Sequence, residues 1–175
     1  KQFGKKAYIT KATSQLMRAL GSIPSPNNCF LLNIGLETLP LRMERHCSNA
    51  QKTAEFLASH EKVSKVIYPG LPGDKYHALA EKYLPNGSCG VISFELEGGR
   101  EAAVRFMDSL ELANICTHVA ASKTMVLHPA SHTHRQVNDE QLREAGVSPG
   151  MIRLSVGIEH IDDILADLEK ALKNA

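Results

Sequence analysis

Tryptophan is missing from this sequence, and aromatic residues make up only 5% of its 175 residues. Apolar residues still account for 43%, so a hydrophobic core must be built mainly from aliphatic side chains. A chain of this length can bury such a core within one domain. No apolar run approaches the roughly eighteen residues that a membrane helix needs, and no signal peptide is recognisable, so we expect no membrane partner.

A large excess of either charge is also missing. The formal net charge is +1 at pH 7, which gives no reason to expect nucleic acid as a partner. Residues 1–52 carry eight Lys and Arg against two acidic residues, whereas residues 53–175 carry twelve against seventeen. Because the basic residues are scattered along apolar helical patterns, we interpret them as an entry segment to a mildly acidic domain and not as a nucleic-acid-binding arm.

The four cysteines lack the spacing of a disulfide framework or a metal site. Cys29, Cys47, Cys89 and Cys116 include no CxxC pair, and the first two lie within helical patterns, as buried free thiols do. We therefore expect a reducing, cytoplasmic setting.

The sequence does contain an alternation of helical and strand patterns. The clearest boundary is the Pro-, Ser- and Asn-rich stretch 22–28, and Pro40 is expected either to begin a second helix or to kink one long helix. Apolar spacing and turn residues predict helices at 7–20, 29–60, 74–83, 101–110, 139–145 and 161–172, and strands at 63–68, 90–96, 115–119, 125–127 and 151–157. This order predicts an α/β (α+β) fold, with one mixed or antiparallel sheet, helices packed on it and a long helical lead-in.

Two groups of residues invite a chemical interpretation that their context does not support. His128, His132 and His134 lie in the segment HPASHTH and could bind zinc, but no carboxylate or thiol completes the set and the spacing fits no standard zinc pattern. Lys123, in the segment ASKTM, has the neighbours of a Schiff-base lysine, but nothing indicates the burial or the nearby cation that such a lysine needs. We favour a polar loop lining a cleft for the histidines and a solvated loop for Lys123.

Arg153 is the most informative single residue. It stands in the middle of the apolar strand pattern MIRLSVG, where a buried guanidinium would need an anion and could grip a carboxylate at two points. The alternative is that Arg153 lies with Ser155 on the wet face of a half-buried strand, and from spacing alone we favour this interpretation. Residue patterns by themselves therefore do not reach an enzyme class.

Several long segments resemble the C-terminal third of the Cys/Met-metabolism enzymes that depend on pyridoxal phosphate (PLP). The matching segments are SPNNCFLLNIGLETLPLRMERHCSNAQKTAEFLASH, YPGLPGDKYHALAEKYLPNGSCGVISFELEGG, HPASHTH and GVSPGMIRLSVGIEHIDDILADLEKAL. They cover nearly the whole chain, and the parts GLETLPLRMERH and RLSVGIEHIDDILADL are long and specific.

The resemblance implies the small C-terminal domain of a fold-type I PLP-dependent transferase. Residues 1–21 would end the large PLP-binding domain, residues 22–60 would form the connecting helical segment, and residues 61–175 would form the C-terminal substrate-recognition domain. The lysine that holds PLP would lie upstream of residue 1, so this segment would contribute no catalytic, cofactor-binding or metal-binding residue and would be inactive alone. Full-length members of the family are usually homotetramers.

For the site, the resemblance implies that residues of this segment recognise the substrate. Arg153 would bind the α-carboxylate of an amino-acid substrate, which overturns the interpretation from spacing, and Thr133 would help to line the same site. His118, followed by Val119, would occupy a position that is usually Ser or Asn. Thr117 stands where γ-lyases tend to carry Glu, which argues against a cystathionine γ-lyase.

The implied reaction is a γ-replacement in amino-acid and sulfur metabolism, in which acetate leaves Cγ of an acetylated homoserine and sulfide or a thiol takes its place. The cystathionine γ-synthase, cystathionine γ-lyase and methionine γ-lyase activities of the same family are alternatives. An alternative of another class is a stand-alone binding or oligomerisation module, which an upstream reading frame encoding a PLP domain would exclude.

Overall fold

The computed structural model describes residues 4–175, and the chain divides into two compact units between Leu39 and Pro40. The first unit is helical: η1 (Gly4–Lys6), α1 (Ala7–Lys11), the π-helical turn η2 (Ala12–Met17) and α2 (Arg18–Leu20) follow one another without a break. Gly21 ends this helix in a left-handed conformation (φ 65°), and its N–H donates to the carbonyl of Met17 at 2.8 Å. The helix predicted at 7–20, with Gly21 as its stop, is confirmed.

The second helix of this unit, α3 (Pro26–Glu37), begins earlier than residue 29, where the sequence placed it. Ser25 is the N-cap, since its side chain accepts a hydrogen bond from the backbone N–H of Asn28 at 3.2 Å. Pro26 fits the first turn because that turn has no intrahelical partner for an N–H. The predicted break at 22–28 therefore extends only to Ser25.

The helices of the first unit bury none of the residues described there. Their exposed apolar side chains include Tyr8, Leu20 and Phe30. The expectation that Cys29 is buried is therefore wrong for this chain, because α3 packs no side chain into a core. None of the helices within residues 4–175 is long and apolar enough to cross a lipid bilayer.

All but the first residue of α4 (Leu39–Ser59), a helix of 21 residues, belongs to the second unit. Pro40 is its second residue, a position at which the missing N–H removes no hydrogen bond from the helix. Of the two outcomes expected for Pro40, the start of a second helix is the one confirmed.

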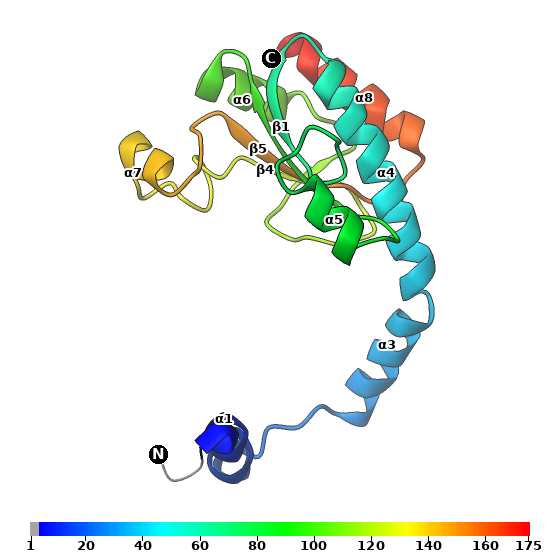
Figure 1. Cartoon of the computed structure of the whole chain (residues 1–175), viewed down its shortest axis with the longest axis vertical. Helices are drawn as coiled ribbons and strands as arrows, with labels where there is room; N and C mark the ends of the chain where they lie inside the picture. The colour runs from blue at the N-terminus through cyan, green and yellow to red at the C-terminus, as the bar shows by residue number, and fades with distance from the viewer. Residues whose placement is uncertain (1–3) are drawn as a thin grey trace. The chain divides into compact units, whose positions relative to one another are not determined.

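A mixed five-stranded sheet in the order β1-β2-β5-β4-β3 forms the body of the second unit (Figure 1). The strands β1 (Val63–Ile67), β2 (Val91–Leu96), β5 (Met151–Ser155) and β4 (Met125–Leu127) pair antiparallel in that order, and β3 (Asn114–Ile115) pairs parallel with β4. β1 and β3 are the edges, and β1 carries a register shift between Val63 and Lys65. The predicted α/β class with a mixed sheet is confirmed.

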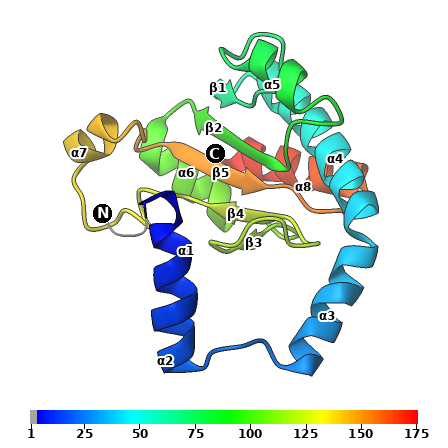
Figure 2. The ribbon, with the colours of Figure 1, turned by 60° about the horizontal axis from the view of Figure 1, so that its bottom comes forward.

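The core lies between this sheet and three helices. α6 (Gly99–Asp108) and α8 (Ile161–Asn174) lie along one face of the sheet (Figure 2), where Phe94 of β2 meets Phe106 of α6 edge-on with ring centroids 5.6 Å apart. α4 joins the same core through Ala50, Ala54 and Leu57, which are fully buried. The division of a full-length protein at 1–21, 22–60 and 61–175 stays a prediction, but within this chain α4 shares its core with the sheet.

Several elements differ from their predicted bounds, among them α5 and β3. α5 (His77–Tyr83) begins later than residue 74 because the Asp74 carboxylate accepts the N–H of Tyr76 in a turn, at 2.8 Å. α7 (Asp139–Glu144) begins as predicted and ends one residue early; its N-terminus carries a capping box between Asn138 and Gln141. The strand predicted at 115–119 shrinks to β3, because the chain then leaves the sheet and Ala120 adopts a positive φ of 59°.

Two buried polar side chains of α4 hold the segment that follows β5, residues 156–159, which we call the β5 extension. His46 Nδ1 donates to the carbonyl of Val156 at 2.7 Å. Asn49 Nδ2 donates to the carbonyls of Gly157 and Glu159 at 3.0 and 2.9 Å. Buried carbonyls without partners would be costly, so α4 both packs against the sheet and satisfies the backbone where the central strand ends.

We expect Asn49→Ala to lower the free energy of unfolding by roughly 1–3 kcal/mol, because it leaves two carbonyls of the β5 extension without their donor. Urea unfolding followed by circular dichroism measures this. Ser48→Ala, one residue earlier and on the exposed side of α4, is the matched control and should change the midpoint little. Equal midpoints for the two variants would contradict the role given to Asn49.

Candidate functional site

Arg153 lies at the centre of the sheet, on β5. Its register partners are Ser93 on β2 and Leu127 on β4. The residues on either side of it, Ile152 and Leu154, are fully buried against the helices, so alternation places the half-buried Arg153 on the other face. Alternation along the strand therefore places Arg153 correctly, on the face of the sheet that α6 and α8 do not cover.

The guanidinium of Arg153 has a neutral partner. Its Nη2 donates to the backbone carbonyl of Thr117 at 2.7 Å. Among residues 4–175, no carboxylate lies within ion-pair distance of Arg153. Since one carbonyl engages only part of the guanidinium, further N–H donors of Arg153 remain for a ligand. The geometry of these donors matches a carboxylate best.

The segment between β3 and β4, residues 116–124, covers this face next to Arg153; we call it the cover loop. The backbone N–H of Ala120 donates to the hydroxyl of Ser155 at 3.0 Å. Ser155 is only 2% exposed, so the expectation that it faces water is wrong, because alternation identifies a face but not what packs on it. The cover loop thus shields part of this face of β5 from solvent.

The far end of the cover loop is anchored on the β5 extension. Thr124 donates twice to the Glu159 carboxylate, from its backbone N–H at 2.6 Å and from its hydroxyl at 3.0 Å. The same hydroxyl accepts the N–H of Gly157 at 2.9 Å. A Cβ on Gly157 would lie 2.1 Å from a Glu159 oxygen, so the position has no room for a side chain. Sequence reasoning missed Thr124 and Glu159, although Glu159 lies within the matching segment RLSVGIEHIDDILADL.

The other predicted substrate residues are exposed. His118 and Val119 lie on the cover loop, directly after the Thr117 whose carbonyl holds Arg153. Thr133 lies in the turn-rich segment that follows β4, and its hydroxyl is 2.9 Å from Nδ1 of the adjacent His134. The structure thus brings His118 and Val119 into one loop with a contact of Arg153, whereas no hydrogen bond within residues 4–175 joins Thr133 to Arg153.

The three histidines of HPASHTH make backbone hydrogen bonds or face solvent. His128 is 1% exposed, and its Nε2 donates to the carbonyl of Pro149 at 2.7 Å. His132 Nδ1 donates to the carbonyl of His128 at 3.0 Å. Within residues 4–175, no three His, Cys, Asp or Glu side chains converge as a metal would require. The geometry therefore favours a structural role for His128 over zinc binding.

The lysines within residues 4–175 lack the burial expected of a cofactor-binding amine. A Schiff-base lysine needs a desolvated or cation-flanked setting that lowers its pKa. Lys123 is exposed, and none of the lysines within residues 4–175 is buried.

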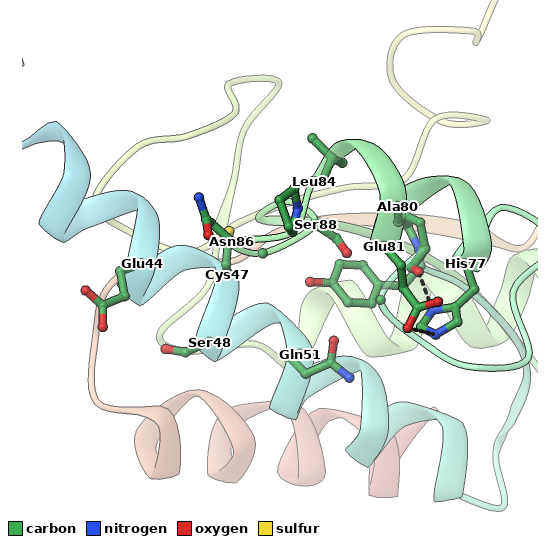
Figure 3. A pocket seen from close by; sticks show the side chains of 15 residues that line it. Glu44, Cys47, Ser48, Gln51, His77, Ala80, Glu81, Leu84, Asn86 and Ser88 are labelled. Carbon is green, nitrogen blue, oxygen red and sulfur yellow. Dashed lines mark hydrogen bonds and ion pairs between the residues drawn. The ribbon is translucent and has the colours of Figure 1, made fainter.

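A separate cleft of about 540 Å³ lies between α4 and α5 (Figure 3). Ser48 and Gln51 line it from α4, and His77 lies across from them on α5, with its Nδ1 2.9 Å from the Pro69 carbonyl. Burial raises the pKa of the Cys47 thiol in this cleft, and the neighbouring Cys89 adds to the effect, so Cys47 is protonated and weakly nucleophilic at neutral pH. None of the predicted substrate residues lines the cleft.

Comparison with known proteins matches residues 3–173 to the Cys/Met metabolism PLP-dependent enzyme family. The O-acetyl-L-homoserine sulfhydrylase of Leptospira meyeri is 51% identical over 169 residues, which are 96% of this chain and 38% of that protein. The homocysteine synthase of Schizosaccharomyces pombe is 46% identical over 173 residues, which are 99% of this chain and 40% of that protein. The chain therefore spans about 40% of the length of these relatives.

A solved structure is similar over the same extent. The crystal structure of a putative O-acetylhomoserine (thiol)-lyase from Campylobacter jejuni, which contains N'-pyridoxyl-lysine-5'-monophosphate, matches with a TM-score of 0.87 and 39% identity. The match covers 98% of this chain and 41% of that one. The fold described above is thus the fold of the matching part of that enzyme.

We expect the His128 imidazole to titrate below its ordinary pKa of 6.5. Burial lowers this pKa most, the bond to the Pro149 carbonyl opposes the shift, and Arg100 and His132 add to it. Because the folded pKa lies below the unfolded one, the contribution of His128 to stability is present above pH 6.5 and is lost as the pH falls below it.

Nuclear magnetic resonance titration of the imidazole Cε1–H signals tests this prediction. The signal that disappears in His128→Gln should have a midpoint below 6.5. His134→Gln, at an exposed position of the same segment, should leave that signal in place. A His128 signal that titrates at 6.5 or above would show that the ring is more solvated than its burial implies.

Proposed function

Because the chain belongs to the Cys/Met metabolism PLP-dependent enzyme family, we propose that it is the C-terminal part of an O-acetylhomoserine sulfhydrylase. The full-length protein would convert O-acetylhomoserine and sulfide to homocysteine and acetate, by exchanging the acetyl-bearing oxygen on Cγ for sulfur. The names of the relatives at 51% and 46% identity support this choice within the family. The similarity of the Campylobacter jejuni structure, at 39% identity, supports it further.

The observation that carries the proposal is the setting of Arg153. Its guanidinium stands in the middle of the sheet with a carbonyl partner and, among residues 4–175, no carboxylate partner. In the proposed enzyme the remaining donors bind the α-carboxylate of O-acetylhomoserine in a two-point grip. A substrate fixed at its carboxylate has its Cα and Cγ held in a defined orientation, which is what a positioning residue contributes to catalysis.

The cover loop and Thr133 would complete the substrate side of the site. His118 and Val119 are exposed on the loop whose Thr117 carbonyl contacts Arg153, so they can meet a substrate bound at Arg153. Thr133 offers an exposed hydroxyl. Ser93, the register partner of Arg153, is small and leaves space on the same face of the sheet.

The proposal assigns PLP to the remainder of the full-length protein, because none of the lysines described in this chain is buried. When bound, PLP supplies the electron sink that permits proton removal at Cα and Cβ and the loss of acetate. The exposed apolar side chains of α1, α2 and α3, which include Tyr8, Leu20 and Phe30, are where the large PLP-binding domain and further copies of a homotetramer would pack.

We expect Arg153→Ala in the full-length enzyme to raise KM for O-acetylhomoserine roughly 10- to 100-fold, because charge-assisted hydrogen bonds to the carboxylate are lost. The absorbance of bound PLP should persist. Arg153→Lys, which keeps the charge and loses the fork, should give an intermediate KM. Arg105→Ala, at an exposed position on α6, is the control, and a wild-type KM in Arg153→Ala would overturn the role of Arg153.

We also expect the full-length enzyme to form homocysteine and acetate from O-acetylhomoserine and sulfide faster than it cleaves cystathionine or methionine. Thiol-detecting chromatography of the products with each substrate measures the ratio. Formation of 2-oxobutyrate from cystathionine or methionine as the dominant activity would assign the chain to a γ-lyase instead. Cystathionine as the main product with cysteine as the thiol donor would assign it to a γ-synthase.

A further inference from the structure

We propose that Thr124 and Glu159 are positioning residues for the amino-acid substrate, which act on Arg153 through the cover loop. The inference rests on the proposed function of Arg153 as the carboxylate-binding residue. Neither residue touches the guanidinium in the hydrogen bonds described within residues 4–175. Their effect is carried by the loop whose Thr117 carbonyl does.

Three of the hydrogen bonds that join the cover loop to β5 and its extension involve alternate residues along one face; we call these three bonds ties. Arg153 donates to the Thr117 carbonyl at 2.7 Å, and the Ser155 hydroxyl accepts the N–H of Ala120 at 3.0 Å. The third tie is the bond from the N–H of Gly157 to the Thr124 hydroxyl, at 2.9 Å. Because residues two apart on a strand share a face, the loop is tied to the same face that carries Arg153.

The third tie is the strongest of the three. Thr124 is fully buried, and its hydroxyl donates to Glu159 while accepting from Gly157. The Thr124 backbone N–H adds a bond to the other Glu159 oxygen at 2.6 Å. Hydrogen bonds to an ionised carboxylate are about twice as strong as neutral ones. The first two ties involve exposed or half-buried groups. Water therefore competes least for the hydrogen bonds between Thr124 and Glu159.

Backbone hydrogen bonds on either side of this pair fix the ends of the cover loop. The carbonyl of Thr124 accepts the N–H of Asn114 at 3.0 Å, which sets β3 against β4 just before the loop begins. Ser122 is held in turn, since its carbonyl accepts the N–H of Ile158 at 2.9 Å. Moving Thr124 would therefore shift the loop and the Thr117 carbonyl, and with it the direction in which the Arg153 guanidinium points.

Glu159 is held through both its side chain and its backbone. Both of its carboxylate oxygens accept hydrogen bonds from Thr124, and Asn49 Nδ2 donates to the Glu159 carbonyl from α4. Gly157 lets the turn close, because any Cβ there would clash with the Glu159 carboxylate.

The test uses the full-length holoenzyme with Thr124→Val, which keeps the shape of the side chain and removes the hydroxyl. KM for O-acetylhomoserine should rise by about tenfold, less than the roughly hundredfold that a 1 Å misplacement can cost. KM for sulfide and the absorbance of bound PLP should stay unchanged. Thr124→Ser, which restores the hydroxyl, should return KM for O-acetylhomoserine toward the wild-type value. Ser122→Ala, which removes an exposed hydroxyl from the same loop, is the matched control.

A double-mutant comparison shows whether the effect passes through Arg153. If it does, Thr124→Val should add no further rise in KM when Arg153 is already Ala. Glu159→Gln, which keeps the size and removes the charge, gives a second reading where Thr124→Val yields too little folded enzyme. A loss of folded enzyme with an unchanged KM in both variants, or an equal rise in the KM for sulfide, would reduce the pair to a purely structural role and overturn the inference.

The role of Arg153 and the role of the Thr124–Glu159 pair are tested by different outcomes. An unchanged KM in Arg153→Ala would overturn the proposed function of Arg153, whatever the outcome for Thr124. A raised KM in Arg153→Ala together with an unchanged KM in Thr124→Val and Glu159→Gln would leave the proposed function in place and overturn only the inference about the anchor.

Discussion

A strand in the middle of a sheet ends inside the protein, and the peptide groups just beyond its end still need hydrogen-bond partners. In this chain that requirement falls on the β5 extension, which is satisfied from two sides. His46 and Asn49 of α4 donate hydrogen bonds to its carbonyls, and the Thr124 hydroxyl accepts a hydrogen bond from one of its N–H groups. A segment held from both sides is a rigid frame. The cover loop is built on that frame, and the direction of Arg153 depends on the cover loop.

The electrostatic character of the site follows from which groups these contacts use. A guanidinium among acidic neighbours would be neutralised within the protein. Here its partner is the Thr117 carbonyl, and its register partner on β2 is the uncharged Ser93. A charge that is oriented but not neutralised can be matched by an anion from outside. In the function proposed above, that anion would be the carboxylate of the amino-acid substrate.

Much of the fold follows from the sequence because hydrophobic periodicity and turn residues are local signals. The helix ending at Gly21 and the strand at 125–127 lie where local pattern predicts them. The cover loop is not predicted, because the residues at 115–119 have the pattern of a strand. In the structure the strand ends at Ile115, and the loop instead contacts Ser155 through the N–H of Ala120. Thr124 and Glu159 have no local signal of their own: they are far apart in the sequence, and only the folded chain joins them. For Arg153, alternation along β5 predicts the face of the sheet on which it lies. That the cover loop packs on this face depends on tertiary structure and has no local signal in the sequence.

The two edges of the sheet show how the fold limits self-association. An exposed edge strand presents unpaired N–H and C=O groups that can recruit a strand from another molecule, which begins aggregation. β3 offers an edge only two residues long, Asn114–Ile115. β1 is longer, but the register shift between Val63 and Lys65 breaks its regular spacing, and Lys65 places an exposed charge on the strand. The register shift and the exposed Lys65 are both features that make an edge strand a poor template for a further strand.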